Sequence, residues 1–176
     1  MITGLSAKGR IALLSLGAVL GIFQLCDIAG IRINTSPSLP LGLYRVSSNP
    51  NANLIEFCPT DSFGRLAITR GYRTRGSCSD GAAPLLKPIV AKPGDLVELS
   101  LRGIAVNGKL LPNTEPRSSD TEGRPLVSWP FGRYRVRVGQ AWVASSYNPR
   151  SFDSRYFGPV PVSSIRDRVE PFLTSW

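Results

Sequence analysis

The segment "DLVELSLRGIAVNGKLL", Asp95–Leu111, decides the fold class. Apolar and polar residues alternate along most of it, which is typical of a strand with one buried face. The alternation stops at Asn107-Gly108, a dipeptide that favours the tight turn of a β-hairpin. The segment therefore predicts antiparallel β structure.

Shorter strand patterns lie on both sides of this hairpin. We expect strands over residues 54–57, 134–138 and 140–146, with polar loops over 59–83 and 112–130. The 176-residue chain contains 17 Gly and 15 Pro residues, and this composition favours turn-rich β structure over a helical bundle. We predict a single mainly β domain without internal repeats.

An apolar run, "IALLSLGAVLGIFQLC" over residues 11–26, precedes this domain. With the residues that follow, it reaches about 20 residues, the length that a bilayer demands. Lys8 and Arg10 precede the run, and basic residues stay on the cytoplasmic side. We expect residues 1–30 to form a cytoplasmic tip and one transmembrane helix. Residues 31–176 would then form an exported domain.

Two other interpretations of the apolar run stay open. A cleavable signal peptide has the same order of basic and apolar residues. A lipoprotein cysteine at Cys26 is a weaker alternative, because Leu25 before it is not a small residue. The sequence alone does not decide whether the segment is retained.

The formal net charge is +9, and the chain contains no histidine. Nucleic acid and anionic lipid headgroups both bind basic proteins. We expect no nucleic-acid partner, because no dense block of Lys and Arg alternates with aromatic residues. The absence of histidine excludes Ser-His-Asp and Cys-His catalysis and any metal site that needs imidazole. A nucleophile here needs Lys, Asp, Glu, an amino terminus or a cofactor for its activation.

The three cysteines are Cys26, Cys58 and Cys78, and none of them forms a CxxC pair. This spacing argues against a zinc site, and we expect no metal. Cys58 and Cys78 would form a disulfide in an oxidising compartment. In a cytosolic protein, they would stay two buried thiols.

Lys87, in "PLLKPIV", is the one lysine of four that lies among apolar residues. The reference pKa of lysine is about 10.4, and burial can lower it by several units. Lys87 is therefore the lysine best suited to act as a general base. The segment on its own favours a simpler role, in which the lysine stem crosses a strand and the amine reaches water.

The segment "NTSPSLPLGLYR", Asn34–Arg45, follows the apolar run. Pro37 and Pro40 restrict the backbone on both sides of Ser38 and would hold its hydroxyl in one orientation. A proline-stiffened exit from a membrane would also explain the prolines, but not the "GLYR" that follows.

In this order, the segments resemble those of the Ser-Lys signal peptidases, family S26, and most closely the TraF-type conjugative-transfer branch. The first motif of that family, S-x-S-x-P, places the nucleophile on Ser38. The second places the base lysine ahead of a Pro-Gly-Asp turn, and "LLKPIVAKPGD" matches it with Lys87. The third, S-x-D-S-R, matches Ser151, Asp153, Ser154 and Arg155.

The resemblance implies a signal-peptidase-like Ser-Lys β-fold and a serine endopeptidase without cofactors. It also implies that the anchor lies in the bacterial inner membrane and that residues 31–176 form a periplasmic catalytic domain. Ser36 would help to form the oxyanion hole, Ser151 would orient Lys87, and Asp153 and Arg155 would form a structural ion pair. The substrate would be an exported precursor, a conjugative pilin subunit in the TraF-type branch. Both a linear and a cyclic product stay open.

Departures from the family pattern leave other functions open. The third motif usually begins with Gly-Asp-Asn, where this chain has Ser145-Ser146-Tyr147, and Pro88 follows the lysine in place of Arg. These differences argue against the broad specificity of a general type I leader peptidase, which is the first alternative. Cytosolic self-cleaving repressors also use a Ser-Lys dyad, but the apolar run speaks against them. The non-enzyme alternative is an anchored scaffold of a secretion or conjugation apparatus.

Overall fold

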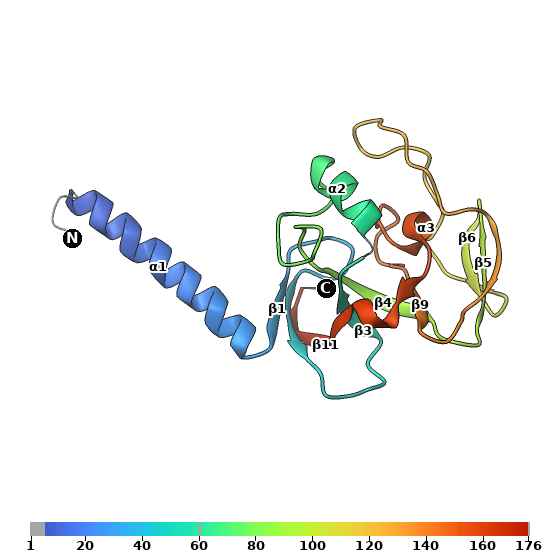
Figure 1. Cartoon of the computed structure of the whole chain (residues 1–176), viewed down its shortest axis with the longest axis horizontal. Helices are drawn as coiled ribbons and strands as arrows, with labels where there is room; N and C mark the ends of the chain where they lie inside the picture. The colour runs from blue at the N-terminus through green and yellow to red at the C-terminus, as the bar shows by residue number, and fades with distance from the viewer. Residues whose placement is uncertain (1–5, 60, 176) are drawn as a thin grey trace.

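The computed structural model describes residues 6–59 and 61–175, without the side chains of residues 18–20, 22–27, 61 and 62. One long helix, α1, projects from a mainly β body (Figure 1). The helical segments after it are α2 (Asp61–Thr69), α3 (Ser154–Phe157) and the 3₁₀ turn η1 (Val162–Ser164). The strands are β1 (Ile31–Asn34), β2 (Gly42–Val46), β3 (Leu54–Phe57), β4 (Leu85–Ala91), β5 (Leu96–Ser100), β6 (Gly103–Val106), β7 (Lys109–Leu110), β8 (Gly132–Arg135), β9 (Gln140–Val143), β10 (Val160–Pro161) and β11 (Ile165–Thr174).

The prediction of a mainly β chain is confirmed. The strand expected over residues 54–57 is β3, and the one expected over 140–146 is the shorter β9. The strand expected over 134–138 lies two residues earlier, as β8. The turn at Asn107-Gly108 joins β6 to β7, with φ of 50° and 83° at its two residues.

The segment Asp95–Leu111 forms three strands, β5, β6 and β7, because the chain also reverses between β5 and β6. Gly103 begins β6 with φ of 118°, and a Cβ there would lie 2.6 Å from Thr114 Oγ1. Only glycine fits this close approach without strain. The alternating pattern hides the extra turn, because it continues on either side of it.

The strands form two antiparallel sheets. The larger has seven strands in the order β1-β2-β11-β3-β4-β9-β10, and the smaller has four in the order β7-β6-β5-β8. Buried apolar residues of β3, β4 and β9, with Phe157 of α3, form one core cluster. A second cluster joins β5 and β6 to Trp142 of β9. A third cluster contains Leu39, which follows Ser38, and Leu86 of β4 packs against it. The core therefore holds β4 and the loop after β1 in fixed positions relative to each other.

The segment from 59 to 83 differs from the predicted polar loop, because it contains α2. Phe63 and Ala67 are four residues apart and therefore share one face of this helix. Ala67 is fully buried, and Phe63 packs against the first core cluster. This single apolar face is too short to stand out in a segment rich in polar residues.

Helix α1 (Ala7–Ile28) coincides with the predicted membrane anchor. Its described side chains are largely exposed, including Leu14 at 75%. No helix among the described residues has both the length and the apolar character needed to span a bilayer. Most of the anchor's second half, with Cys26, lies outside the described side chains. The anchor therefore stays a prediction.

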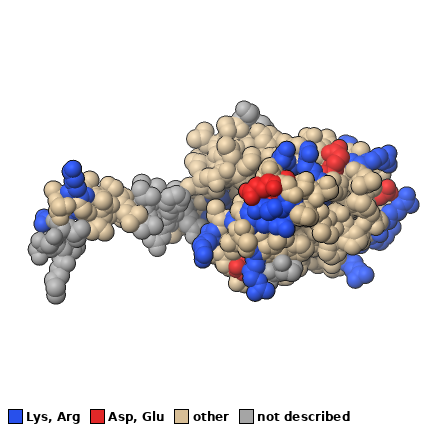
Figure 2. All heavy atoms as spheres, turned by 90° about the horizontal axis from the view of Figure 1, so that it is seen from above, with Lys and Arg blue, Asp and Glu red and all other residues tan. Residues whose placement is uncertain are grey.

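Basic side chains are distributed over the surface, with several at the end of the body away from α1 (Figure 2). That end carries β5 and β6 (Figure 1). Acidic groups lie between them in this view, so the basic side chains on this face do not form one continuous block.

Candidate active site

The loop that carries Ser38 joins β1 to β2, and the buried side chain of Asn34 organises it. Asn34 Nδ2 donates hydrogen bonds to the carbonyls of Ser36 at 3.0 Å and Pro40 at 3.0 Å. Its Oδ1 accepts from the Ser36 N–H at 3.1 Å. The hydroxyl of Tyr44 donates to the Pro40 carbonyl at 2.8 Å. These bonds, together with the prolines, hold the loop in one conformation.

Two of the predicted site residues, Ser36 and Ser38, contact each other. Their hydroxyl oxygens lie 2.9 Å apart, and the Ser38 N–H donates to Ser36 Oγ at 3.4 Å. Ser38 is buried, whereas Ser36 is exposed. The Ser36 hydroxyl therefore lies beside both the hydroxyl and the backbone N–H of Ser38.

Lys87 lies in β4 and is only 3% exposed, so its amine does not reach water. Lys87 Nζ donates a hydrogen bond to Ser151 Oγ at 2.7 Å. Burial lowers the pKa of Lys87 to about 8, against the opposing effect of the Asp153 carboxylate and with a further lowering by Arg155. A substantial fraction of this amine is neutral near pH 8 and can accept a proton.

Asp153 and Arg155 form a fully buried ion pair beside the lysine. Arg155 Nε and Nη2 bind the two carboxylate oxygens of Asp153, each at 2.8 Å. Arg155 Nη1 also donates to the carbonyls of Asn113 and Pro149, both at 3.1 Å. A buried pair needs such additional partners to offset the loss of hydration. The pair thus joins the loops around the site.

Two further residues, Ser145 and Asn148, hold the Ser38 loop from the opposite side. Ser145 Oγ donates to the carbonyl of Ser38 at 2.5 Å, and Asn148 Nδ2 donates to that of Pro37 at 3.2 Å. The Ser145 N–H donates to Asp153 Oδ2 at 3.0 Å. The sequence identifies Ser145 only as a departure from the family motif and gives neither residue a role, because no local pattern indicates a contact such as that of Ser145 with Ser38, 107 positions away.

The segment 145–151 consequently contacts both halves of the candidate dyad. It binds the Ser38 backbone at its start and the Lys87 amine at its end. In the described part of the chain, no hydrogen bond joins Ser38 Oγ directly to Lys87 Nζ. Free enzymes often form this catalytic bond only with substrate in place.

A groove of about 430 Å³ lies beside Ser38. One wall is the end of β1 with the loop up to Ser38, and the other comes from residues 71–74 and 83–86. Strand β1 is at the edge of its sheet, so an extended chain can lie along it. The groove therefore fits a peptide better than a compact ligand.

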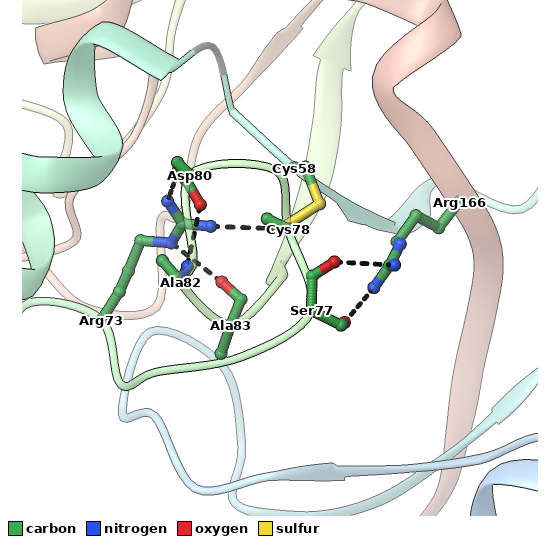
Figure 3. Close-up of a disulfide and its surroundings, with 8 residues drawn as sticks. All are labelled: Cys58, Arg73, Ser77, Cys78, Asp80, Ala82, Ala83 and Arg166. Carbon is green, nitrogen blue, oxygen red and sulfur yellow. Dashed lines mark hydrogen bonds and ion pairs between the residues drawn. A yellow bond between two sulfur atoms is a disulfide. The ribbon is translucent and has the colours of Figure 1, made fainter.

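The second wall is braced by a disulfide and a buried ion pair (Figure 3). Cys58 and Cys78 are joined in a disulfide. Arg73 binds Asp80 at 2.6 Å and donates to the carbonyl of Ala83 at 2.9 Å. Figure 3 shows these groups converging on the loop that precedes β4. The disulfide and the ion pair therefore hold this loop in place as the groove wall opposite the Ser38 loop.

Known proteins match almost the whole chain. A family model described as "Signal peptidase, peptidase S26" matches residues 7–173. A plasmid transfer protein TraF of Escherichia coli is 37% identical, covering 83% of this chain and 84% of that protein. A conjugal transfer protein TraF of Agrobacterium fabrum is 38% identical, covering 84% of each chain. A probable conjugal transfer protein TraF of Sinorhizobium fredii is 35% identical, covering 98% and 95%.

A solved signal peptidase I of Enterococcus faecalis V583 aligns at 18% identity with a TM-score of 0.38, covering 70% of this chain and 97% of that one. A score this low does not establish a shared fold. Membership follows instead from the family model and from the three relatives over most of their length. The chain belongs to the signal peptidase family, peptidase S26, and is related within it to the TraF proteins of plasmid transfer.

Proposed function

We propose that the chain is a membrane-anchored serine endopeptidase in which Ser38 is the nucleophile and Lys87 the general base. The observation that carries this proposal is the buried Lys87 amine, which has a pKa of about 8 and a hydrogen bond to Ser151. A buried ammonium costs stability, and a purely structural domain gains nothing from one. A general base uses the neutral form that this burial favours.

In the proposed mechanism, neutral Lys87 takes the proton of the Ser38 hydroxyl as Oγ attacks the scissile carbonyl. The Ser38 N–H and the Ser36 hydroxyl stabilise the resulting oxyanion, each donor contributing about 3–4 kcal/mol in the transition state. Lys87 then protonates the leaving amine, and an acyl-enzyme remains on Ser38. Ser151 keeps the amine in place throughout.

The proposed substrate is an exported protein precursor, and a conjugative pilin subunit in particular. The names of the relatives, which are plasmid and conjugal transfer proteins, support this choice. Only β1 and its loop separate the end of α1 from Ser38. Cleavage would therefore take place on the periplasmic side, close to the inner membrane. Water would release a linear product from the acyl-enzyme, and the substrate's own amine would release a cyclic one.

The proposal is tested by incubating a candidate pilin precursor with the full-length protein and its variants. We expect Ser38→Ala and Lys87→Ala each to abolish cleavage and to leave the circular dichroism spectrum unchanged. Lys92→Ala, at an exposed lysine five positions away, is the matched control and should cleave normally. An active Lys87→Ala variant would falsify the dyad and favour the scaffold alternative.

The mass of the product shows whether water or the substrate's own amine releases it from the acyl-enzyme. A cyclic product is one water lighter than the linear product. Cleavage of many unrelated preproteins at similar rates would instead favour a general leader peptidase.

A further inference from the structure

A second hollow, of about 120 Å³, lies next to the groove. Tyr72 lines both spaces. Arg150 and Phe152 also line the hollow, and they flank Ser151, the partner of Lys87. The hollow therefore adjoins the groove beside Ser38 at Tyr72, and two of its lining residues are the sequence neighbours of Ser151.

The floor of the hollow is apolar. The ring of Phe152 stacks on that of Tyr156, with centroids 5.3 Å apart and planes at 13°. Phe152 also contacts Tyr72, at 5.2 Å between centroids, and Leu126 completes the lining. This floor suits the aliphatic part of one side chain.

The rim of the hollow carries an excess of positive charge. Its one carboxylate, Asp120, is already bound by the Tyr72 hydroxyl at 2.5 Å and by Arg124 Nε at 2.6 Å. Arg117 and Arg150, both exposed, also line the hollow. Within the described residues, neither of these two guanidinium groups has a hydrogen bond or an ion pair.

Two further carboxylates lie close by but do not neutralise them. Glu122 binds Arg124 Nη1 at 3.1 Å. Glu115 lines a neighbouring pocket together with Arg117 and Arg150, yet it forms no ion pair with either among the described residues. Two positive charges over an apolar floor select an acidic side chain, whose stem packs on the floor and whose carboxylate reaches the rim.

The position of the hollow indicates which part of a substrate reaches it. The lysine that accepts the Ser38 proton must also deliver a proton to the leaving amine. The released segment therefore departs on the side of Lys87 and Ser151, and Arg150 and Phe152, which flank Ser151 in the sequence, line the hollow. We infer, resting on the proposed function, that the hollow binds an acidic residue in the segment that follows the cleaved bond.

The test measures binding to the full-length Ser38→Ala protein, so that no probe is consumed. The probes are three fluorescent peptides with small residues in A-x-A order before the bond, differing only in Glu, Gln or Lys in the following segment. We expect the Glu peptide to bind about fivefold more tightly than the Gln peptide, and the Lys peptide to bind most weakly. The preference should shrink at about 1 M salt, where the screening length is about 3 Å.

The substitutions Arg117→Gln and Arg150→Gln, combined in the Ser38→Ala protein, should make the three affinities equal. Arg133→Gln is the matched control, because Arg133 is an exposed arginine of β8 in the other sheet, 74% exposed at its side chain and paired with Glu98. It should leave the preference intact.

Equal affinities for the three peptides in the Ser38→Ala protein would overturn the inference. A preference that survives the double arginine substitution would overturn it as well. Cleavage assays with Ser38 intact separate this inference from the proposed function. Cleavage without any charge preference would contradict only the proposed binding of an acidic residue in the hollow. A charge preference in binding, without cleavage of any probe, would contradict only the proposed peptidase activity.

Discussion

Lys87 would have to meet two requirements that usually conflict. A general base is best buried, because burial favours the neutral amine, but burying a charged amine lowers the stability of the fold. Its stem lies in β4, and its Nζ has one described hydrogen-bond partner, Ser151. The Asp153–Arg155 pair nearby is itself neutral overall and fully buried. Its carboxylate raises the pKa of Lys87 and its guanidinium lowers it, so burial dominates and the pKa falls to about 8.

We therefore expect activity to rise with pH. Below a pKa of about 8, the neutral fraction of Lys87 grows about tenfold per pH unit, and kcat/KM should grow with it. Above that pKa, the profile should level off, because the base is already neutral. Rates measured from pH 6 to 10 on one precursor check this. A profile that is flat between pH 6 and 8 would contradict the role of Lys87.

Ser145 should act on catalysis as a positioning residue. Ser145→Ala removes the hydrogen bond to the Ser38 carbonyl and leaves that buried group unpaired. We expect kcat to fall by about tenfold to a hundredfold, with KM nearly unchanged because the groove keeps its walls. Ser146→Ala, next to it, is the control and should have normal kcat. A Ser145→Ala variant with full kcat would show that the bond is dispensable.

At the scale of elements, the site is assembled from segments far apart in the sequence. The β1–β2 loop supplies Ser36 and Ser38, β4 supplies Lys87, and the segment after β9 connects them. The segment before β4 forms a groove wall and depends on the Cys58–Cys78 disulfide. Each element is short, so cross-links and buried polar groups hold the site together.

Removal of the disulfide should therefore loosen the wall. The bond joins residues 20 positions apart, and a loop of this length corresponds to about 3 kcal/mol of unfolding free energy. We expect Cys58→Ser with Cys78→Ser to lower the urea midpoint and to reduce kcat/KM. Reductant should destabilise the original protein and have no effect on the double variant. Equal midpoints for the two proteins would contradict this role.

The features that the sequence predicts are those encoded by neighbouring residues. The turn at Asn107-Gly108 needs only two residues in the left-handed region. The apolar neighbours of Lys87 indicate its burial, and the spacing of Ser36 and Ser38 brings two hydroxyls to one loop.

The features that it does not predict depend on distant contacts. The need for glycine at position 103 comes from the close approach of Thr114. The hydrogen bond between Ser145 and Ser38 joins residues 107 positions apart. Helix α2 is stabilised by packing on the core more than by its own polar sequence. Family motifs identify the candidate catalytic residues Ser38 and Lys87. They do not indicate which other side chains, such as Ser145, hold these residues in position.

At the scale of the whole molecule, α1 projects from the body on the side of β1, and the small sheet lies at the opposite end (Figure 1). The proposed anchor would thus hold the Ser38 loop close to a membrane and direct the small sheet away from it. This arrangement would place the nucleophile where exported precursors emerge.

Anchoring can be tested with charges placed at exposed apolar positions of α1. Leu14 and Leu16 are 75% and 57% exposed, and each arginine in a membrane segment costs about 2.5–3.5 kcal/mol. We expect the full chain in the membrane fraction and the Leu14→Arg, Leu16→Arg variant in the soluble fraction. Leu101→Arg, an equally exposed leucine in the β body, is the control. A soluble unsubstituted chain would contradict the anchor.

The central proposal, that Ser38 attacks and Lys87 activates it, is tested most directly by trapping the acyl-enzyme. The full-length protein is mixed with a precursor, quenched in acid within seconds and analysed by intact mass and peptide mapping. We expect a substrate fragment attached by an ester to Ser38, and no adduct in Ser38→Ala or Lys87→Ala. An adduct on another residue, or an undiminished adduct in Lys87→Ala, would contradict the dyad.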